Sequence, residues 1–371
     1  MATTTVEMRP SLTTKDIVAV IWSIVIFAAS IGLVVYGLLI LLGTFSAASI
    51  LDVAPQLVTG IILTAAGIII FPRYLRLLNA IFRNNDFKLA RETMVIDFFQ
   101  LILLVVLASI LFPVLWIISM SLDPRDFSRP QGLTIIPPGA TLASYFKVLT
   151  QPSPNPVTFL QLLRNSLLVS GGTALLSVII GTSAAYAFSR LVFPGRRLGM
   201  LGFVLVLMIP PGGTLAPLFV LLNALRIRTT LFGLAIAFTS TALPFAIWNM
   251  KGFIDSLPYD LEEAAQIDGA TRTQGFLRVI LPLAMPGIAV TALWGFLTGW
   301  SEFILSWTFL VDPSTFTLPM VMRGMVGQYA SGTPWAQFSA MAILVSIPPV
   351  LIFFLLQRYL VGGLAVGGVK G

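Results

Sequence analysis

Long apolar segments constrain this chain of 371 residues more than any other feature of its sequence. A helix that crosses a bilayer needs about 20 mainly apolar residues, and a backbone in lipid must satisfy its own hydrogen bonds. Eight segments approach or exceed that length, at residues 17–42, 53–71, 96–121, 166–188, 198–222, 231–250, 279–310 and 336–361. The sequence therefore predicts an all-α, polytopic membrane protein.

The composition supports this class and excludes several kinds of site. Hydrophobic residues make up 57% of the chain and charged residues only 10%, whereas a soluble domain carries about a quarter charged residues. The chain has no cysteine and no histidine, which excludes disulfides, thiol or histidine catalysis, and Cys/His metal sites. It also has no Gly-x-x-x-x-Gly-Lys-[Ser/Thr] phosphate loop. We therefore predict that this chain has no catalytic residue, metal or cofactor of its own and cannot hydrolyse ATP alone.

For two of the segments, the sequence must also indicate whether they remain in the protein and cross the membrane. The first, residues 17–42, exceeds the roughly 7–15 apolar residues of a signal peptide, so we interpret it as a retained span. The second, residues 53–71, has an unbroken apolar part only from residue 57, so a short tilted helix and a re-entrant hairpin are both open.

The placement of Lys and Arg predicts how the chain is oriented. With the N-terminus in the cytoplasm, the cytoplasmic segments hold 15 of these residues and the opposite side holds 7. Cytoplasmic loops are enriched in Lys and Arg, so we predict that both termini lie in the cytoplasm. The net charge of +7 then reflects topology, and we predict no nucleic-acid partner.

The chain divides into two predicted parts. Residues 1–95 form an extension with two spans and a basic loop, and residues 96–371 form a domain with six spans. The basic loop, residues 72–95, is either a plain positive anchor or includes a helix that meets anionic lipid headgroups. On the opposite side, the proline-rich loop 122–164 predicts an irregular cap without a helix, and a second long loop follows at residues 311–335.

A polar segment, Leu261-Glu-Glu-Ala-Ala-Gln-Ile-Asp-Gly-Ala270, interrupts the apolar pattern. At 100° per residue it forms a short helix with Leu and Ala on one face and Glu262, Glu263 and Gln266 on the other. Pro258 suits its first turn, and Gly269 suits a left-handed position at its end. Thr271 and Gln274 form a Thr-x-x-Gln capping box for the next helix. The pattern fits a docking helix and an ordinary connecting helix equally well.

The same segment resembles the EAA signature of ABC importer permeases, Glu-Ala-Ala-x3-Gly-x9-Ile-x-Leu-Pro. Here the run is Glu263-Ala264-Ala265, Gly269 and then Val279-Ile-Leu281-Pro282, with valine for isoleucine as the one departure. The stretches Ala184-Ala-Tyr-Ala-Phe-Ser-Arg190, Trp300-Ser-Glu-Phe303 and the C-terminal Gln357-Arg-Tyr-Leu360 resemble the MalG-type carbohydrate permeases in particular. The resemblance covers about residues 96–371.

This resemblance implies a six-helix type I importer permease core, with two further N-terminal transmembrane helices in this chain. Its implied partners are a second, MalF-like permease, two ATPase subunits that carry ATP and Mg²⁺, an extracytoplasmic sugar-binding protein and membrane lipids. The coupling loop, residues 255–282, would contact an ATPase subunit. The residues implied in that contact are Glu262, Glu263, Ala264, Ala265, Asp268, Gly269, Leu281 and Pro282. The tail with Lys370 and Gly371 would also reach the ATPase subunits.

Two regions are candidates for the substrate pathway. Glu302 lies inside a predicted span and either bonds sugar hydroxyls or bonds a neighbouring backbone at a helix end. Trp300 and Trp307, seven residues apart, share a face of that span and fit sugar stacking or interface anchoring. The run Ile-Pro210-Pro211-Gly212-Gly breaks another span and predicts either a pathway element or a packing kink.

The sequence leaves the transported solute open. The leading interpretation is a maltose-like sugar or oligosaccharide. An ABC permease for a polyol or glycerol phosphate and a secondary transporter are the alternatives. No predicted span holds an Arg or Lys near its middle, which favours a neutral solute over a phosphorylated one.

Overall fold

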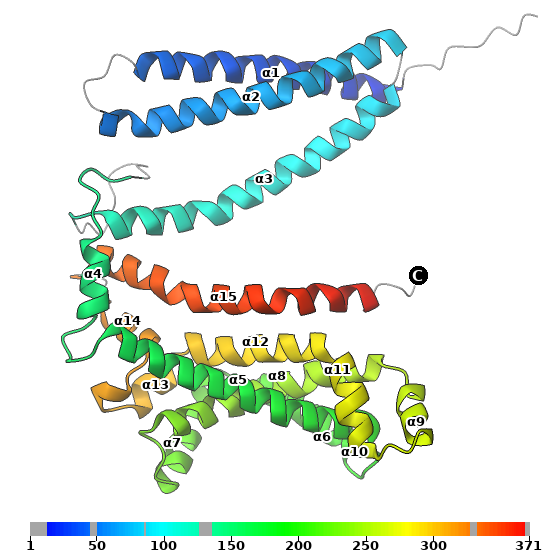
Figure 1. The fold of residues 1–371 in the computed structure, drawn as a ribbon, viewed down its shortest axis with the longest axis vertical. Coiled ribbons are helices and arrows are strands. Elements are labelled where there is room, and N and C mark those ends of the chain that lie inside the picture. Colours follow the sequence, from blue (N-terminus) through cyan, green and yellow to red (C-terminus); the bar gives the residue numbers. More distant parts are fainter. Residues whose placement is uncertain (1–12, 45–49, 85–86, 126–135, 327–331, 368–371) are drawn as a thin grey trace, which may run out of the picture. The chain divides into compact units, whose positions relative to one another are not determined.

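The computed structural model describes residues 13–44, 50–84, 87–125, 136–326 and 332–367, and the regular elements in these ranges are helices (Figure 1). Six of the helices are long and apolar enough to cross a membrane, or up to eight if each of two bent pairs counts as one span. The chain separates into two compact units, residues 1–119 with 131–138 and residues 120–130 with 139–371.

The first unit contains α1 (Thr14–Thr44), α2 (Ile50–Asn84) and most of α3 (Phe87–Leu122). Helices α1 and α2 pack closely because small residues face each other, and a side chain on Gly37 or Gly67 would collide with the opposite helix. A salt bridge of 3.2 Å joins Arg73 on α2 to Asp97 on α3.

The length of α2 tests two predictions for this unit, one for residues 53–71 and one for the basic loop. Because α2 is one continuous helix, the re-entrant alternative for residues 53–71 is wrong, and the helix exceeds the predicted span at both ends. Residues 72–84 continue α2 and residues 87–95 begin α3, so the described part of the basic loop forms no separate surface helix.

The second unit is built around α5 (Phe159–Arg190), α8 (Leu231–Ser256), α12 (Met285–Ser301) and α15 (Trp335–Gly367). Helix α12 lies so close to α5 that a Cβ on Gly299 would approach Ser170 Cα to 2.8 Å, and one on Gly295 would approach Ala174 Cα to 2.9 Å. A Gly-x-x-x-Gly pair facing small residues is a common means of close packing between membrane helices. These contacts determine the spacing of the bundle.

Two predicted spans are bent. Helices α6 (Arg196–Leu207) and α7 (Leu215–Ala224) meet at 107° around the turn η1 (Pro211–Thr214), so the predicted break at residues 209–213 is confirmed. The segment Arg272–Leu283 meets α12 at 77°. The single span predicted for residues 279–310 is therefore wrong, because the chain bends at residue 284 and α12 ends at Ser301.

The short elements of this unit gather at the two ends of the bundle (Figure 1). At one end lie α9 (Asp260–Ile267), α10 (Arg272–Gly275), η2 (Phe276–Ile280) and α11 (Leu281–Leu283). At the other lie α4 (Ala143–Thr150), α13 (Ile304–Phe309), η3 (Pro313–Thr315) and α14 (Leu318–Gly324). Because α4 is helical, the prediction that the loop 122–164 contains no helix is wrong.

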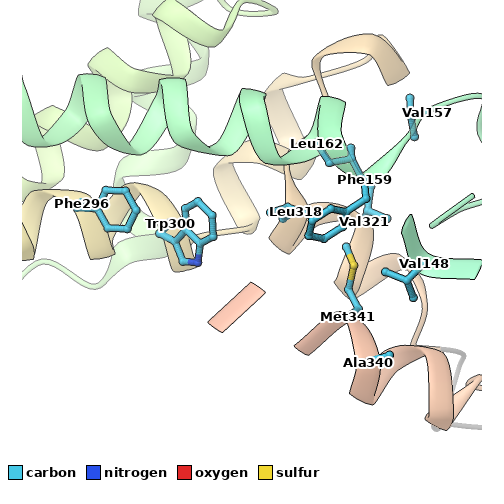
Figure 2. Close-up of a cluster of buried hydrophobic side chains, with 10 residues drawn as sticks. All are labelled: Val148, Val157, Phe159, Leu162, Phe296, Trp300, Leu318, Val321, Ala340 and Met341. Carbon is cyan, nitrogen blue, oxygen red and sulfur yellow. The ribbon is translucent and has the colours of Figure 1, made fainter. Parts of the chain in front are cut away.

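The end with α4 and α14 is fixed to α5 by hydrogen bonds and by a buried cluster. Asn165 Nδ2 donates to the carbonyl groups of Ser314 at 2.8 Å and Phe316 at 3.0 Å, and the Leu318 amide donates to Ser166 Oγ at 2.8 Å. Figure 2 shows the cluster, in which apolar side chains from α4, α5, α12, α14 and α15 pack together. This end of the bundle is thus held on α5.

Candidate functional site

The polar segment forms the short helix α9, and the helix ends as the sequence predicts. Gly269 has a φ of 86°, in the left-handed region that favours glycine. The Gly269 amide donates to the Gln266 carbonyl at 3.0 Å and the Ala270 amide donates to the Ala265 carbonyl at 2.9 Å, which is a Schellman ending. The start differs slightly, since Pro258 precedes the cap residue Tyr259 and does not lie in the first turn.

The next turn is also capped as expected. The Thr271 side chain accepts from the Gln274 amide, and the Gln274 side chain accepts from the Thr271 amide at 2.8 Å. The helical conformation therefore ends at Gly269 and begins again after Thr271, so the orientation of α9 is defined relative to the helix that follows it.

Helix α9 leaves most of the signature residues exposed. From the start of α9 to its end, the exposed residues are Asp260, Leu261, Glu263, Ala264, Gln266, Ile267, Asp268 and Gly269. Ile267 is 86% exposed, although it is a large apolar side chain. Ala265 is half-buried. Carboxylates, a small-residue patch and an uncovered isoleucine lie together here, and such a surface can bind another protein.

Glu262 lies on the opposite side of α9, inside the protein. Its side chain is 10% exposed and faces Arg190, whose side chain is 3% exposed at the last residue of α5. Arg190 Nε donates to Glu262 Oε1 at 2.5 Å, and the Tyr186 hydroxyl donates to Glu262 Oε2 at 2.9 Å. Glu262 and Glu263 are adjacent in the sequence, yet only Glu263 presents its carboxylate outward.

Further contacts hold Arg190 in place. Its Nη2 donates to the Leu257 carbonyl at 2.8 Å, and its guanidinium lies 4.0 Å from the centre of the Tyr259 ring. The Tyr259 hydroxyl donates to the Ser189 carbonyl at 3.0 Å. Sequence reasoning missed this cluster because nothing in the sequence places the end of α5 beside α9. The available signal was that adjacent residues on a helix point about 100° apart, so the two glutamates need not share one environment.

The other signature residues lie on the turn that follows. Leu281 is half-buried and Pro282 is exposed, and both belong to α11, which precedes the bend at Ala284. Beneath the turn lies an apolar cluster formed by Ala185, Met250, Ile254, Ile280 and Ala284. Lys370 and Gly371 lie outside the described residues.

The tryptophan and glutamate proposed for the pathway occupy structural positions. Trp300 is 4% exposed, stacks on Phe296 at 5.3 Å, and donates from Nε1 to the Val345 carbonyl at 3.2 Å (Figure 2). Glu302 accepts from the amides of Ile304 at 2.8 Å and Leu305 at 3.0 Å, so it caps α13. This is the backbone-bonding alternative for Glu302.

The prediction that Trp300 and Trp307 share a helix face is wrong. Helix α12 ends at Ser301, and Trp307 lies on the separate helix α13 with 56% of its surface exposed. The carboxylate of Glu302 competes for the amides that would otherwise continue the helix, which explains why the chain turns there.

The run at residues 209–213 lies at the bend between α6 and α7. Pro210 and Gly212 are exposed, and the Pro211 side chain lies outside the described residues. One cavity of about 500 Å³ is lined by residues of α6, α8 and α11, including Trp248 and Asn249. Another, of about 950 Å³, lies at the α4 end and is lined in part by Trp307. Trp300, Glu302, Pro210 and Gly212, the other pathway candidates whose side chains are described, line neither cavity.

Asn249 links two helices. Its Nδ2 donates to Thr291 Oγ1 at 3.0 Å and to the Gly287 carbonyl at 3.3 Å, so it joins α8 to α12. In the described part of the chain, no group of three or more acidic, His or Cys side chains is placed to hold a metal ion.

Comparison with known proteins connects this geometry to a family. Residues 177–366, which include α9 and its capping turns, match the model of the binding-protein-dependent transport system inner membrane component. Among solved structures, a chain of a bacterial ABC transporter involved in the import of the acidic polysaccharide alginate has a similar fold. Its TM-score is 0.60 at 22% identity, over 72% of this chain and 98% of that chain.

Several curated proteins are also similar to this chain. The trehalose transport system permease protein SugB of Mycobacterium tuberculosis is 34% identical over 70% of this chain and 93% of its own length. The galactooligosaccharides transport system permease protein GanQ of Bacillus subtilis is 35% identical over 77% of this chain and 99% of its own length. The maltose/maltodextrin transport system permease protein MalG of Salmonella typhimurium is 34% identical over 72% of this chain and 94% of its own length.

Proposed function

Since this chain belongs to the family of binding-protein-dependent transport system inner membrane components, we propose that it forms half of a sugar translocation pathway and couples that pathway to ATPase subunits. The chain is a permease subunit of a carbohydrate ABC importer, as relatives named for trehalose, galactooligosaccharide and maltose transport indicate. This family membership rules out the secondary-transporter alternative.

The proposed partners follow from the family. They are a second, MalF-like permease, two ATPase subunits and an extracytoplasmic sugar-binding protein, and the family description itself names dependence on a binding protein. ATP and Mg²⁺ would bind to the ATPase subunits, since this sequence has no phosphate loop. The other half of the pathway would come from the second permease.

The observation that carries the coupling proposal is the exposed face of α9. It combines the exposed Ala264 and the half-buried Ala265 with an outward Glu263 and a left-handed Gly269 at one end of the helical bundle. A surface of this kind allows close approach of a partner, and the carboxylate can form a charge-assisted hydrogen bond with an Arg or Lys of an ATPase subunit. Because Glu262 is engaged by Arg190, we assign the outward contact to Glu263, and Asp268 at the end of α9 offers a second exposed carboxylate.

The orientation is part of the same proposal. The end of the bundle that bears α9 lies in the cytoplasm, where the ATPase subunits are, and both termini lie on that side. The excess of Lys and Arg on the segments of this side supports that placement. The tail with Lys370 and Gly371 extends toward the ATPase subunits.

The proposed substrate is a neutral sugar of the disaccharide or oligosaccharide class. The names of the relatives favour sugars over a polyol or glycerol phosphate. The absence of an Arg or Lys near the middle of any predicted span favours an uncharged solute. The choice among sugars would rest largely with the binding protein and the second permease.

The test is reconstitution of the complete complex in proteoliposomes, with trehalose, maltose and galactooligosaccharides offered in turn. We expect uptake that requires ATP and the binding protein. The variant Glu263→Lys should weaken ATPase binding by about 2 kcal/mol or more, since it replaces a charged contact with a repulsive one. Asp260→Lys, on the same helix but outside the signature, is the matched control. Uptake without ATP, or equal loss of ATPase binding in both variants, would contradict the proposal.

A further inference from the structure

We propose that the buried ion pair between Arg190 and Glu262 is the joint through which movement of α9 reaches α5. The inference rests on the proposed coupling of α9 to ATPase subunits, and it assigns the two adjacent glutamates different tasks. Glu263 faces the partner, and Glu262 fastens the helix to the bundle. Arg190 and Glu262 are thus positioning residues that transmit motion and do not contact the sugar.

The first support is that α9 has no apolar anchor. All eight residues of α9 are described, and Glu262 is its single buried residue. A helix this short is marginal in water and needs tertiary contacts to keep its place. Its buried contact with the bundle is therefore ionic, with hydrogen bonds of 2.5 Å from Arg190 Nε and 2.9 Å from the Tyr186 hydroxyl.

The second support is that the joint is fixed from several directions. Both oxygens of Glu262 accept hydrogen bonds from α5. Arg190 also bonds the Leu257 carbonyl before α9, and Tyr259 lies against the guanidinium while its hydroxyl bonds the Ser189 carbonyl. The helix and its entry segment are therefore attached to the last turn of α5, and rotation of α9 would break several bonds together.

The third support is that the buried contact is an ion pair and not an apolar contact. A buried ion pair adds little stability compared with apolar packing, because both charges lose their hydration. The ion pair instead fixes the orientation of Glu262 relative to Arg190, since a guanidinium defines the angle of the hydrogen bonds that it donates. Helix α5 in turn packs against α8 and α12, so a displacement of its end is passed to the core of the bundle.

The variant Glu262→Gln tests the joint in the complete reconstituted complex. It keeps the size of the side chain but removes its charge, so α9 remains available to the ATPase subunits and is held less firmly. We expect sugar transported per ATP hydrolysed to fall about tenfold, a change typical of residues that couple two sites. Lys251→Gln, which removes an ion pair within α8, is the matched control and should leave this ratio unchanged.

A distance measurement decides the matter even if Glu262→Gln prevents assembly. The natural chain has no cysteine, so spin labels can be placed at Val192→Cys, just after α5, and Ile267→Cys, on α9. These positions are 95% and 86% exposed. With the ion pair intact, we expect one narrow distance distribution that is the same without nucleotide and with ATP bound.

The outcomes separate the joint from the coupling proposal. A label distance that changes on ATP binding, or an unchanged transport ratio in Glu262→Gln, overturns the joint and leaves the coupling proposal in place. A wild-type complex without ATP-dependent uptake overturns the coupling proposal itself. A constant distance together with a reduced ratio in Glu262→Gln supports the joint.

Discussion

Two adjacent residues, Glu262 and Glu263, occupy opposite environments. A helical projection of the sequence places both on the polar side of α9, and it does not identify which one faces a partner. The structure separates them because Arg190, 72 residues earlier, lies beside Glu262. The side-chain content of the site could be predicted, but its division into an inward and an outward carboxylate depends on a contact between distant segments.

Gly269 provides a test at the level of a single residue. Its φ of 86° lies in the left-handed region that favours glycine, and Gly269→Asp also adds a negative charge to this exposed surface, so it should detach or uncouple the ATPase subunits. Membrane insertion should be unaffected, because the change lies outside the spans. Gly269→Asn, an uncharged side chain of nearly the same size that also occurs at this position of helix ends, is the control and should retain more coupling. Measured ATPase stimulation as strong in Gly269→Asp as in the natural chain would contradict this role.

At the level of helices, the sequence predicted where the membrane spans lie. It predicted only some of the places where those spans are broken. Apolar length alone located α5, α8 and α15 to within several residues at most ends. The Pro-Pro-Gly-Gly run correctly indicated the bend between α6 and α7. The end of α12 was missed, because Glu302 looks like an intramembrane carboxylate until its bonds to the following amides are seen. Hydropathy does not register a helix break of this kind.

The close packing of α12 on α5 gives a second prediction. A Cβ on Gly299 would lie 2.8 Å from Ser170 Cα, so Gly299→Ala must push the helices apart. We expect a loss of stability of about 1–3 kcal/mol, typical of overpacking. Gly171→Ala makes the same chemical change where nothing lies within 4 Å, and it should be neutral or slightly stabilising. Thermal unfolding of the purified variants measures the difference, and equal midpoints would refute the packing role.

At the level of the whole molecule, the structure groups α1, α2 and most of α3 apart from the bundle. The predicted boundary at residue 95 stays a prediction. The relative GanQ is matched over 99% of its length by 77% of this chain, so this chain has a segment that GanQ lacks. We assign that segment to the N-terminal helices, which pack on each other through their own small residues.

Removal of residues 1–84 tests this assignment. The transport bundle and α9 lie in the second unit, so the shortened chain should still support ATP-driven sugar uptake with its partners. Uptake is normalised to the amount of permease in the membrane, since loss of α1 and α2 exposes apolar residues of α3 such as Met94. Uptake abolished in a shortened chain that accumulates normally would make the N-terminal helices part of the transport machinery.

The central claim is that α9 is the place where ATP hydrolysis in a partner subunit enters this chain as motion. Site-specific cross-linking tests it most directly, because the natural chain has no cysteine and Ala264 is exposed on α9. A photoreactive group at Ala264→Cys should cross-link to an ATPase subunit in the complete complex, and one at Val311→Cys, at the opposite end of the bundle, should not. A cross-link from Ala264→Cys to the binding protein, or to no ATPase subunit at all, would contradict the claim.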